Sequence, residues 1–128
     1  MAKTTQITVT AESKPGVLAK VCDVLAKAAV NIVAVCAADA AGRGKIRLVV
    51  SDPARAREAL AAAKIRCGEE PALLLSMDDR PGALAGVASR LAAAKINIKC
   101  AYATTAGGGR AQVVVVVANP DKAERALE

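Results

Sequence analysis

Hydrophobic and polar residues follow two kinds of spacing along this chain, which together predict short strands and amphipathic helices. Residues 6–10 alternate between polar and apolar side chains, which predicts a strand with one buried face. From about residue 15 to residue 29 the apolar residues recur every three or four positions, which predicts a helix. The buried side of this helix is expected to carry Val17, Leu18, Val21, Leu25 and Ala28.

The same kinds of pattern continue through the first half of the chain. Residues 31–38 and 45–50 are apolar segments separated by a glycine-containing turn at residues 41–44, which predicts a β-hairpin. A second helix is expected from Asp52-Pro53 to about residue 63, and a further strand is expected to begin within residues 64–67. The predicted order is βαββαβ.

The second half repeats this order. Strands are predicted over residues 72–77, 96–104 and 110–118, with helices over residues 81–94 and from Asn119-Pro120 onward. We expect one module over residues 1–69 and a second over residues 70–128, joined by a linker at residues 68–71. The second module has no counterpart of the last strand, so we expect either a truncation or an edge covered by another strand or subunit.

A duplicated motif supports the two modules. Pro15, Gly16 and Leu18 recur 66 residues later as Pro81, Gly82 and Leu84, and Asn31-Ile32 recurs as Asn97-Ile98. Residues 12–34 and 78–100 align without a gap, with 10 identities in 23 positions. An internal repeat of this length indicates one small α/β module that is used twice.

Composition excludes several classes of function. The chain contains no His, which is the commonest metal ligand and the usual general base near neutral pH. Its only aromatic residue is Tyr102, so base-stacking platforms for nucleic acid are lacking. The net charge of +6 comes from scattered Lys and Arg residues, which we interpret as a solvated surface. The four cysteines form no Cys-x-x-Cys pattern, and we expect small thiols in a reducing cytoplasm, with no metal and no cofactor.

The repeated motif lies between a predicted strand and the beginning of a predicted helix. The first N–H groups of a helix have no partner within the helix, and the helix dipole favours an anion there. Gly16 and Gly82 would let a ligand approach the backbone, and the acidic Glu12 and Asp78 could hold an amine. A carboxylate and an amine together are the groups of an α-amino acid. The same residues also fit ordinary turn and helix-end chemistry, so this reading competes with a structural one.

The order of elements and the motif (Asp/Glu)-x-x-Pro-Gly-x-Leu followed by Asn-Ile resemble the ACT domain family, over nearly the whole chain. The resemblance implies an α+β fold of two ferredoxin-like modules, each an antiparallel sheet with its helices on one face. It also implies a regulatory protein with no catalytic activity. An amino acid effector is expected at an interface between ACT domains.

By position, the resemblance assigns ligand contacts to equivalent residues of the two modules. These are Glu12, Lys14, Pro15, Gly16, Val17, Leu18, Asn31 and Ile32, and Asp78, Arg80, Pro81, Gly82, Ala83, Leu84, Asn97 and Ile98. The expected partners are the amino acid, a second copy of the chain in a homodimer, and a separate metabolic enzyme or regulator. We expect no membrane partner and no nucleic acid.

Two alternatives stay open from the sequence. RNA-binding domains share the βαββαβ order and are often basic, although this chain lacks the aromatic residues that stack on bases. A purely structural dimerisation module would show no response to small molecules.

Overall fold

The computed structural model describes residues 2–128, which form six strands and four helices. Their bounds are β1 Ala2–Glu12, α1 Val17–Lys27, β2 Ile32–Ala40, β3 Arg43–Val50, α2 Pro53–Ala62, β4 Gly68–Asp78, α3 Ala83–Ala93, β5 Cys100–Gly107, β6 Arg110–Val116 and α4 Pro120–Leu127. The chain forms two compact units. We call residues 5–70 the first unit, and residues 71–128 together with Ala2–Thr4 the second unit.

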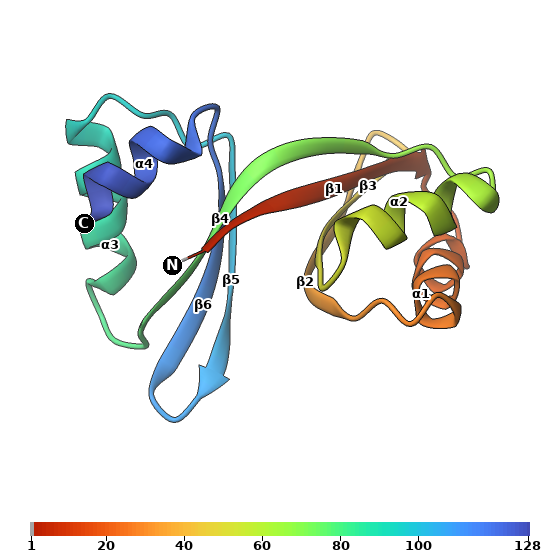
Figure 1. Cartoon of the computed structure of the whole chain (residues 1–128), viewed down its shortest axis with the longest axis horizontal. Coiled ribbons are helices and arrows are strands. Elements are labelled where there is room, and N and C mark those ends of the chain that lie inside the picture. Colours follow the sequence, from red (N-terminus) through yellow and green to blue (C-terminus); the bar gives the residue numbers. More distant parts are fainter. Residues whose placement is uncertain (1) are drawn as a thin grey trace. The chain divides into compact units, whose positions relative to one another are not determined.

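Each unit is an antiparallel sheet with two helices on one face (Figure 1). In the first unit β3 lies between β1 and β2, with Ile7 opposite Leu48 and Val35 also opposite Leu48. In the second unit β6 lies between β4 and β5, with Leu74 opposite Val114 and Tyr102 also opposite Val114. Two βαββαβ modules of ferredoxin-like fold, as the sequence predicts, are confirmed.

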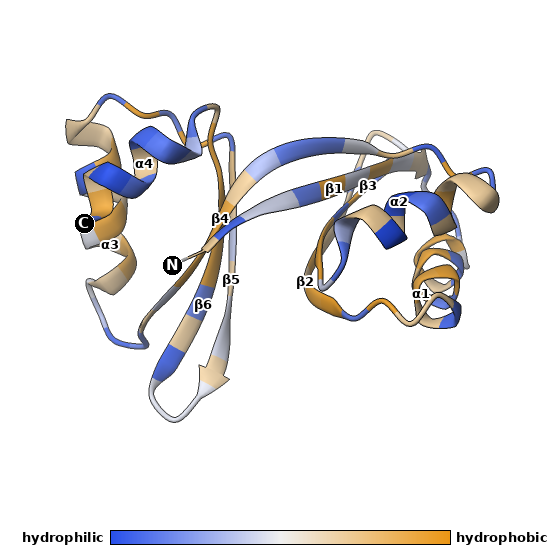
Figure 2. Cartoon of the chain, viewed as in Figure 1, coloured by the Kyte–Doolittle hydropathy of each residue, from blue (hydrophilic) through white to orange (hydrophobic). Residues whose placement is uncertain are grey.

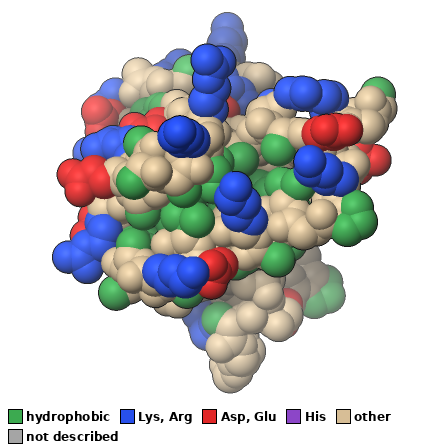
Figure 3. All heavy atoms as spheres, turned by 90° about the vertical axis from the view of Figure 1, so that its right-hand side faces the viewer, with side chains coloured by type: hydrophobic (Ala, Val, Ile, Leu, Met, Phe, Trp, Pro, Cys, Tyr) green, Lys and Arg blue, Asp and Glu red, His purple; other side chains and the backbone are tan. Residues whose placement is uncertain are grey.

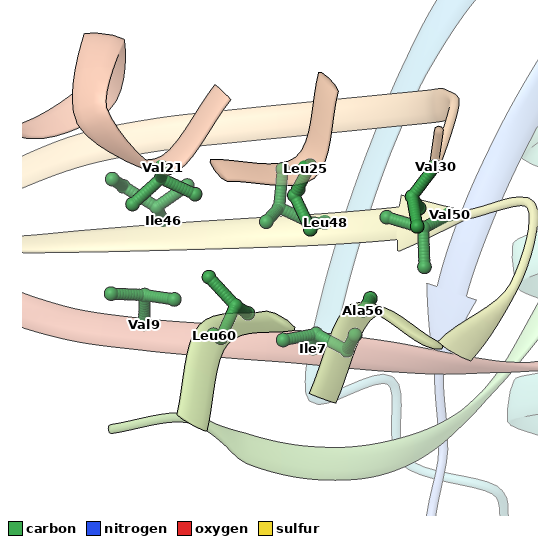
Figure 4. Packing of buried hydrophobic residues seen from close by; sticks show 10 residues of the cluster. All are labelled: Ile7, Val9, Val21, Leu25, Val30, Ile46, Leu48, Val50, Ala56 and Leu60. Atoms are coloured by element: carbon green, nitrogen blue, oxygen red, sulfur yellow. The ribbon is translucent and has the colours of Figure 1, made fainter. Parts of the chain in front are cut away.

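The first unit has a core built from alternate residues of two strands and the apolar sides of two helices. Ile7 and Val9 of β1 face the helices, as do Ile46, Leu48 and Val50 of β3. Figure 4 shows Val21 of α1 against Ile46 and Leu25 against Leu48, while Ala56 and Leu60 of α2 lie over β1. Val21 and Leu25 belong to the predicted apolar side of the first helix, whereas Leu18, also expected there, is 42 % exposed. Figure 2 shows α1 mainly in the colours of hydrophobic residues.

The core of the second unit is built from positions equivalent to those of the first unit. It contains Leu73, Leu75, Leu91, Val113, Val115, Val117 and Ala123. Val114 and Val116, which alternate with these residues along β6, are also buried. Burial on both faces explains why this strand reads as a continuous run of valine.

The sequence places the beginning of the first and third helices two residues too early. Gly16 and Gly82 have φ angles of 92° and 89°, so neither can be part of a right-handed helix. Pro15 therefore precedes the N-cap residue instead of occupying the first turn. The prediction that Asp52-Pro53 and Asn119-Pro120 begin helices is confirmed, because both prolines are first helical residues behind a capping side chain.

Residues 68–71, predicted as a linker, open the continuous strand β4, Gly68–Asp78, and the two units divide within them, between Glu70 and Pro71. Residues 65–67, predicted as the beginning of a strand, have no regular structure. Pro71 is compatible with a strand, since its fixed φ lies in the extended range and it favours an extended residue before it.

β1 and β4 are neighbours in the strand order, and each begins in one unit and ends in the other. Ala2–Thr4 of β1 belongs to the second unit, and Gly68–Glu70 of β4 belongs to the first. Lys3 donates a hydrogen bond to Asp121 of α4, with 2.7 Å between Nζ and Oδ1. The N-terminal residues of β1 thus belong to the second unit, although they directly precede the first unit in the sequence.

Candidate functional site

The loops that precede α1 and α3 have the same backbone geometry. In each loop a glycine in the left-handed region, Gly16 or Gly82, caps the helix. Each loop is also fixed to the tip of the neighbouring hairpin. The Ser13 N–H donates to the Gly42 carbonyl at 2.9 Å, and the Asp79 N–H donates to the Gly109 carbonyl at 2.8 Å. The hairpin and the beginning of the helix therefore form one structural feature in each module.

The four helices differ in whether a side chain accepts hydrogen bonds from the N–H groups of the first turn. The Asp52 and Asn119 side chains accept hydrogen bonds from the N–H groups of Arg55 and Lys122, each at 3.1 Å, which caps α2 and α4. No side chain caps α1 or α3, and neither helix has an acidic residue in its first turn. The uncapped ends are those that carry the repeated motif, and an external anion would complete them.

A pocket of about 220 Å³ lies at the uncapped beginning of α1. One wall comes from the loop and first helical turn, namely Glu12, Ser13, Lys14, Val17 and Leu18. The other wall comes from the β2–β3 hairpin, namely Ala37, Ala38, Asp39, Gly44, Lys45 and Ile46. The pocket is thus lined by two acidic and two basic side chains together with apolar ones, which is a charge pattern that suits a zwitterion.

The pocket brings together four of the residues expected from the sequence, which are Glu12, Lys14, Val17 and Leu18. Pro15 and Gly16 belong to the same loop but do not line the pocket. Asn31 and Ile32 lie at the beginning of β2, whereas the pocket uses its far end. The Asn31 backbone exchanges two hydrogen bonds of 2.9 Å with Ser51, and Ile32 packs against the core.

In the second module the acidic residue of the motif is already engaged. Asp78 accepts a hydrogen bond of 2.6 Å from Arg110, and Arg80 lies 3.7 Å from its other oxygen. Glu12 is the counterpart of Asp78 and faces Arg43 in the strand register, yet no ion pair joins Glu12 to a cation among the described residues. The first module therefore keeps a carboxylate available for a ligand.

The remaining predicted residues of the second module lie at the two ends of α3. Pro81 and Gly82 form the loop, while Ala83 and the 48 % exposed Leu84 open α3. Asn97 is exposed between α3 and β5, and Ile98 packs against the core. The structure thus gathers residues 78–84 at one end of α3 and leaves Asn97 and Ile98 beyond its other end.

The sequence did not indicate Asp39 or Lys45 as site residues. Their counterparts under the repeat are Thr105 and Gln112, so the duplicated motif carries no signal at these positions. The signal that could have found them is the turn at Ala41-Gly42, which folds the hairpin back toward the loop.

Residues 2–128, the part of the chain that the structure describes, contain neither a metal-binding cluster nor a membrane-spanning helix. These residues contain no cluster of three or more Cys, Asp or Glu side chains that could hold a metal ion. No helix in the same range has the length and apolar character needed to cross a membrane.

A family model described as an ACT domain pair matches residues 2–128. The chain belongs to the ACT domain pair family. ACT domains are regulatory and not catalytic, in keeping with the expectation that this protein is not an enzyme. No curated protein sequence matches the chain.

Solved structures agree with this assignment. A protein from Bacteroides thetaiotaomicron is 34 % identical, with a TM-score of 0.89, and the match covers 98 % of this chain and 86 % of that one. The ligand-free regulatory subunit of aspartate kinase from Thermus thermophilus is 21 % identical, with a TM-score of 0.72, covering 99 % and 93 %. The corresponding subunit from Thermus flavus is 18 % identical, with a TM-score of 0.65, covering 98 % and 93 %. The two Thermus structures support the fold of this ACT domain pair.

Proposed function

We propose that this ACT domain pair is an amino acid sensor whose effector binds in the pocket at the beginning of α1. The observation that carries the proposal is a helix end without a cap beside a pocket lined by Glu12, Asp39, Lys14 and Lys45. The volume of about 220 Å³ is below the roughly 300–1,000 Å³ typical of drug-sized ligands, which suits a molecule as small as an amino acid.

Each part of an amino acid has a complementary group in this pocket. The free N–H groups in the first turn of α1, together with Lys14, would bind the carboxylate. Glu12 and Asp39 would bind the ammonium group. Val17, Leu18 and Ile46 would contact the side chain and exclude water from it. Both carboxylates are available for the ammonium group, because neither Glu12 nor Asp39 makes an ion pair within the described residues.

The regulatory step would be a change in how ACT domains of two copies of the chain pack. Leu18 lines the pocket and is 42 % exposed, so a second copy that covered it would also enclose the ligand. A ligand shifts such an equilibrium only if it binds one packing arrangement more tightly than the other. The protein regulated by this change would be a separate metabolic enzyme or regulator. Four free cysteines are compatible with the reducing cytoplasm in which such a sensor would work.

A thermal-shift screen of the proteinogenic amino acids tests the proposal, with nucleotides and a short RNA as comparison ligands. One or two amino acids should raise the melting temperature, because a ligand at a hundredfold excess over its Kd stabilises the folded state by about 2.7 kcal/mol. A shift with RNA alone would favour the RNA-binding alternative, and the absence of any shift would favour a structural dimerisation module. Light scattering with and without the amino acid reports the change in assembly.

Matched substitutions locate the site by calorimetry. Leu18→Asp places a carboxylate in the first turn of α1, where it stabilises the helix dipole and repels the ligand carboxylate. Leu84→Asp makes the same change in the exposed first turn of α3. We expect Leu18→Asp to abolish binding and Leu84→Asp to preserve it. The opposite pattern, or binding by both variants, would contradict the assigned pocket.

Glu12→Gln tests the ammonium contact. We expect an affinity loss of about tenfold or more, since hydrogen bonds to charged groups contribute about 1.5–3 kcal/mol. Glu58→Gln is the matched control, because Glu58 is exposed on α2 and lies outside the pocket. An equal loss in both variants would indicate an effect of net charge only.

A further inference from the structure

We propose that the first unit has a second binding site, which takes a small anion with an aliphatic chain. The site is a groove of about 380 Å³ between α1, the end of β1 and the connection from α2 to β4. We call it the basic groove. Four cationic side chains line it, Lys14, Lys20, Lys64 and Arg66.

No carboxylate lines the basic groove, and its cations are unpaired. Within residues 2–128, none of the four forms an ion pair with Asp or Glu. Other cations of the same unit do find partners, such as Lys27 with Asp23 at 3.0 Å and Arg57 with Glu69 at 2.6 Å. Unpaired like charges that line one groove repel each other, and a bound anion would relieve this repulsion.

The interior of the basic groove is aliphatic. Val17 and Ile65 line it with partly exposed side chains, and the core residues Val9 and Val21, each 2 % exposed, lie beneath them. Thr10 also lines the groove. Figure 3 shows a face of the molecule on which hydrophobic side chains gather in the centre, surrounded by Lys and Arg side chains and by several Asp and Glu side chains. An aliphatic chain laid on these residues would gain roughly 25 cal/mol for each Å² of apolar surface removed from water.

The cationic surface extends beyond the groove. Arg66 also lines two further hollows, of about 600 Å³ and about 270 Å³, and no carboxylate lines either one. The smaller hollow includes Thr8, whose buried Oγ1 has no hydrogen-bond partner.

The basic groove shares Lys14 and Val17 with the amino acid pocket but differs from it in chemistry. That pocket has two acidic side chains for an ammonium group, whereas the groove has none. The groove therefore fits an anion without a compensating positive charge. The second module does not reproduce all the cations of the basic groove, since the residue that corresponds to Lys20 is Gly86.

Methyl NMR with octanoate as the probe tests the proposal on the full chain with labelled valine and isoleucine. We expect octanoate to shift the methyl signals of Val17 and Ile65, and octylammonium to leave them in place. The double variant Lys64→Gln/Arg66→Gln should raise the octanoate Kd by about tenfold, whereas Lys27→Gln/Arg55→Gln, which removes two exposed cations elsewhere in the same unit, should not. Binding should weaken as salt rises.

Three outcomes would overturn the proposal. Equal shifts with octanoate and octylammonium would show apolar adsorption without charge recognition. An unchanged Kd in Lys64→Gln/Arg66→Gln would place the octanoate elsewhere. No shift with octanoate, together with shifts caused by a poly-glutamate peptide, would identify the groove as a surface for acidic protein segments. Because amino acid binding is measured separately, failure of either proposal leaves the other intact.

Discussion

At the scale of single residues, three helices end on a residue in a conformation that glycine normally adopts. Ala29, Lys64 and Lys95 follow α1, α2 and α3 with φ angles of 58°, 61° and 59°. The N–H of the residue that follows each of them donates to a carbonyl in the last turn of the helix, which is the Schellman arrangement. In α1, the Val30 N–H donates to the Leu25 carbonyl at 2.9 Å. These positions reverse the chain direction at the cost of local backbone strain.

Substituting glycine at such a position should stabilise the protein. We expect Lys95→Gly to raise the free energy of unfolding by about 0.5–1 kcal/mol, because relief of about 1–2 kcal/mol of strain exceeds the extra entropy of the unfolded chain. Ala29→Gly is the equivalent change in the first module. Urea denaturation measures the effect, with Lys95→Ala as a control that keeps the strain. Destabilisation by Lys95→Gly would contradict this reading of the helix end.

At the scale of elements, the junction between α2 and β4 is held by an ion pair of 2.6 Å between Arg57 and Glu69. Cys67 lies beside it, immediately before β4. Partial burial raises the pKa of the Cys67 thiol, and the charge of Glu69 raises this pKa further, while Arg57 opposes the change. A raised pKa leaves less reactive thiolate at any pH below it.

The reactivity of Cys67 should therefore respond to its two charged neighbours in opposite directions. Glu69→Gln should lower the pKa of Cys67 and speed its alkylation by iodoacetamide near pH 8, and Arg57→Gln should raise that pKa and slow the reaction. Mass spectrometry of the modified peptides gives the rate, with Cys22 in the same molecule as the internal reference. Changes of the same sign in both variants would rule out electrostatic control.

At the scale of the whole molecule, the N-terminal residues join the second unit instead of the module to which they are adjacent in sequence. The bond from Lys3 lowers the pKa of Asp121, and Asp121 raises the pKa of Lys3. The pair therefore stabilises the fold between the two pKa values. Its contribution is lost as the pH falls through the lowered Asp121 pKa, and again as the pH rises through the raised Lys3 pKa.

Breaking this bond should loosen the second unit selectively. In Lys3→Gln we expect faster hydrogen exchange at pH 7 in Ala2–Thr4 and α4, with exchange in β3 unchanged. The difference from the wild type should vanish well below the ordinary Asp pKa of 3.8, where Asp121 is protonated. Lys27→Gln, which breaks an exposed pair within α1, serves as the control. Equal loosening of both units would contradict the assignment of residues 2–4.

The sequence by itself determined the features that depend on local interactions. Alternating and helical spacing identified the strands and helices, the Asp52-Pro53 and Asn119-Pro120 caps marked two helix starts, and the repeat around Pro-Gly indicated two ACT modules. Each of these signals lies within a few residues of the structure that it specifies, so it can be read without knowing the fold.

Only the tertiary structure decided which distant segments meet. It placed Ala2–Thr4 with the second unit, made residues 68–71 part of β4, and brought Asp39 and Lys45 to the loop at the beginning of α1. Strand pairing joins any two segments with free backbone groups, and the choice among them depends on packing and closure of the whole sheet. That choice leaves no local mark in the sequence, because the backbone groups that pair are the same in every residue except proline.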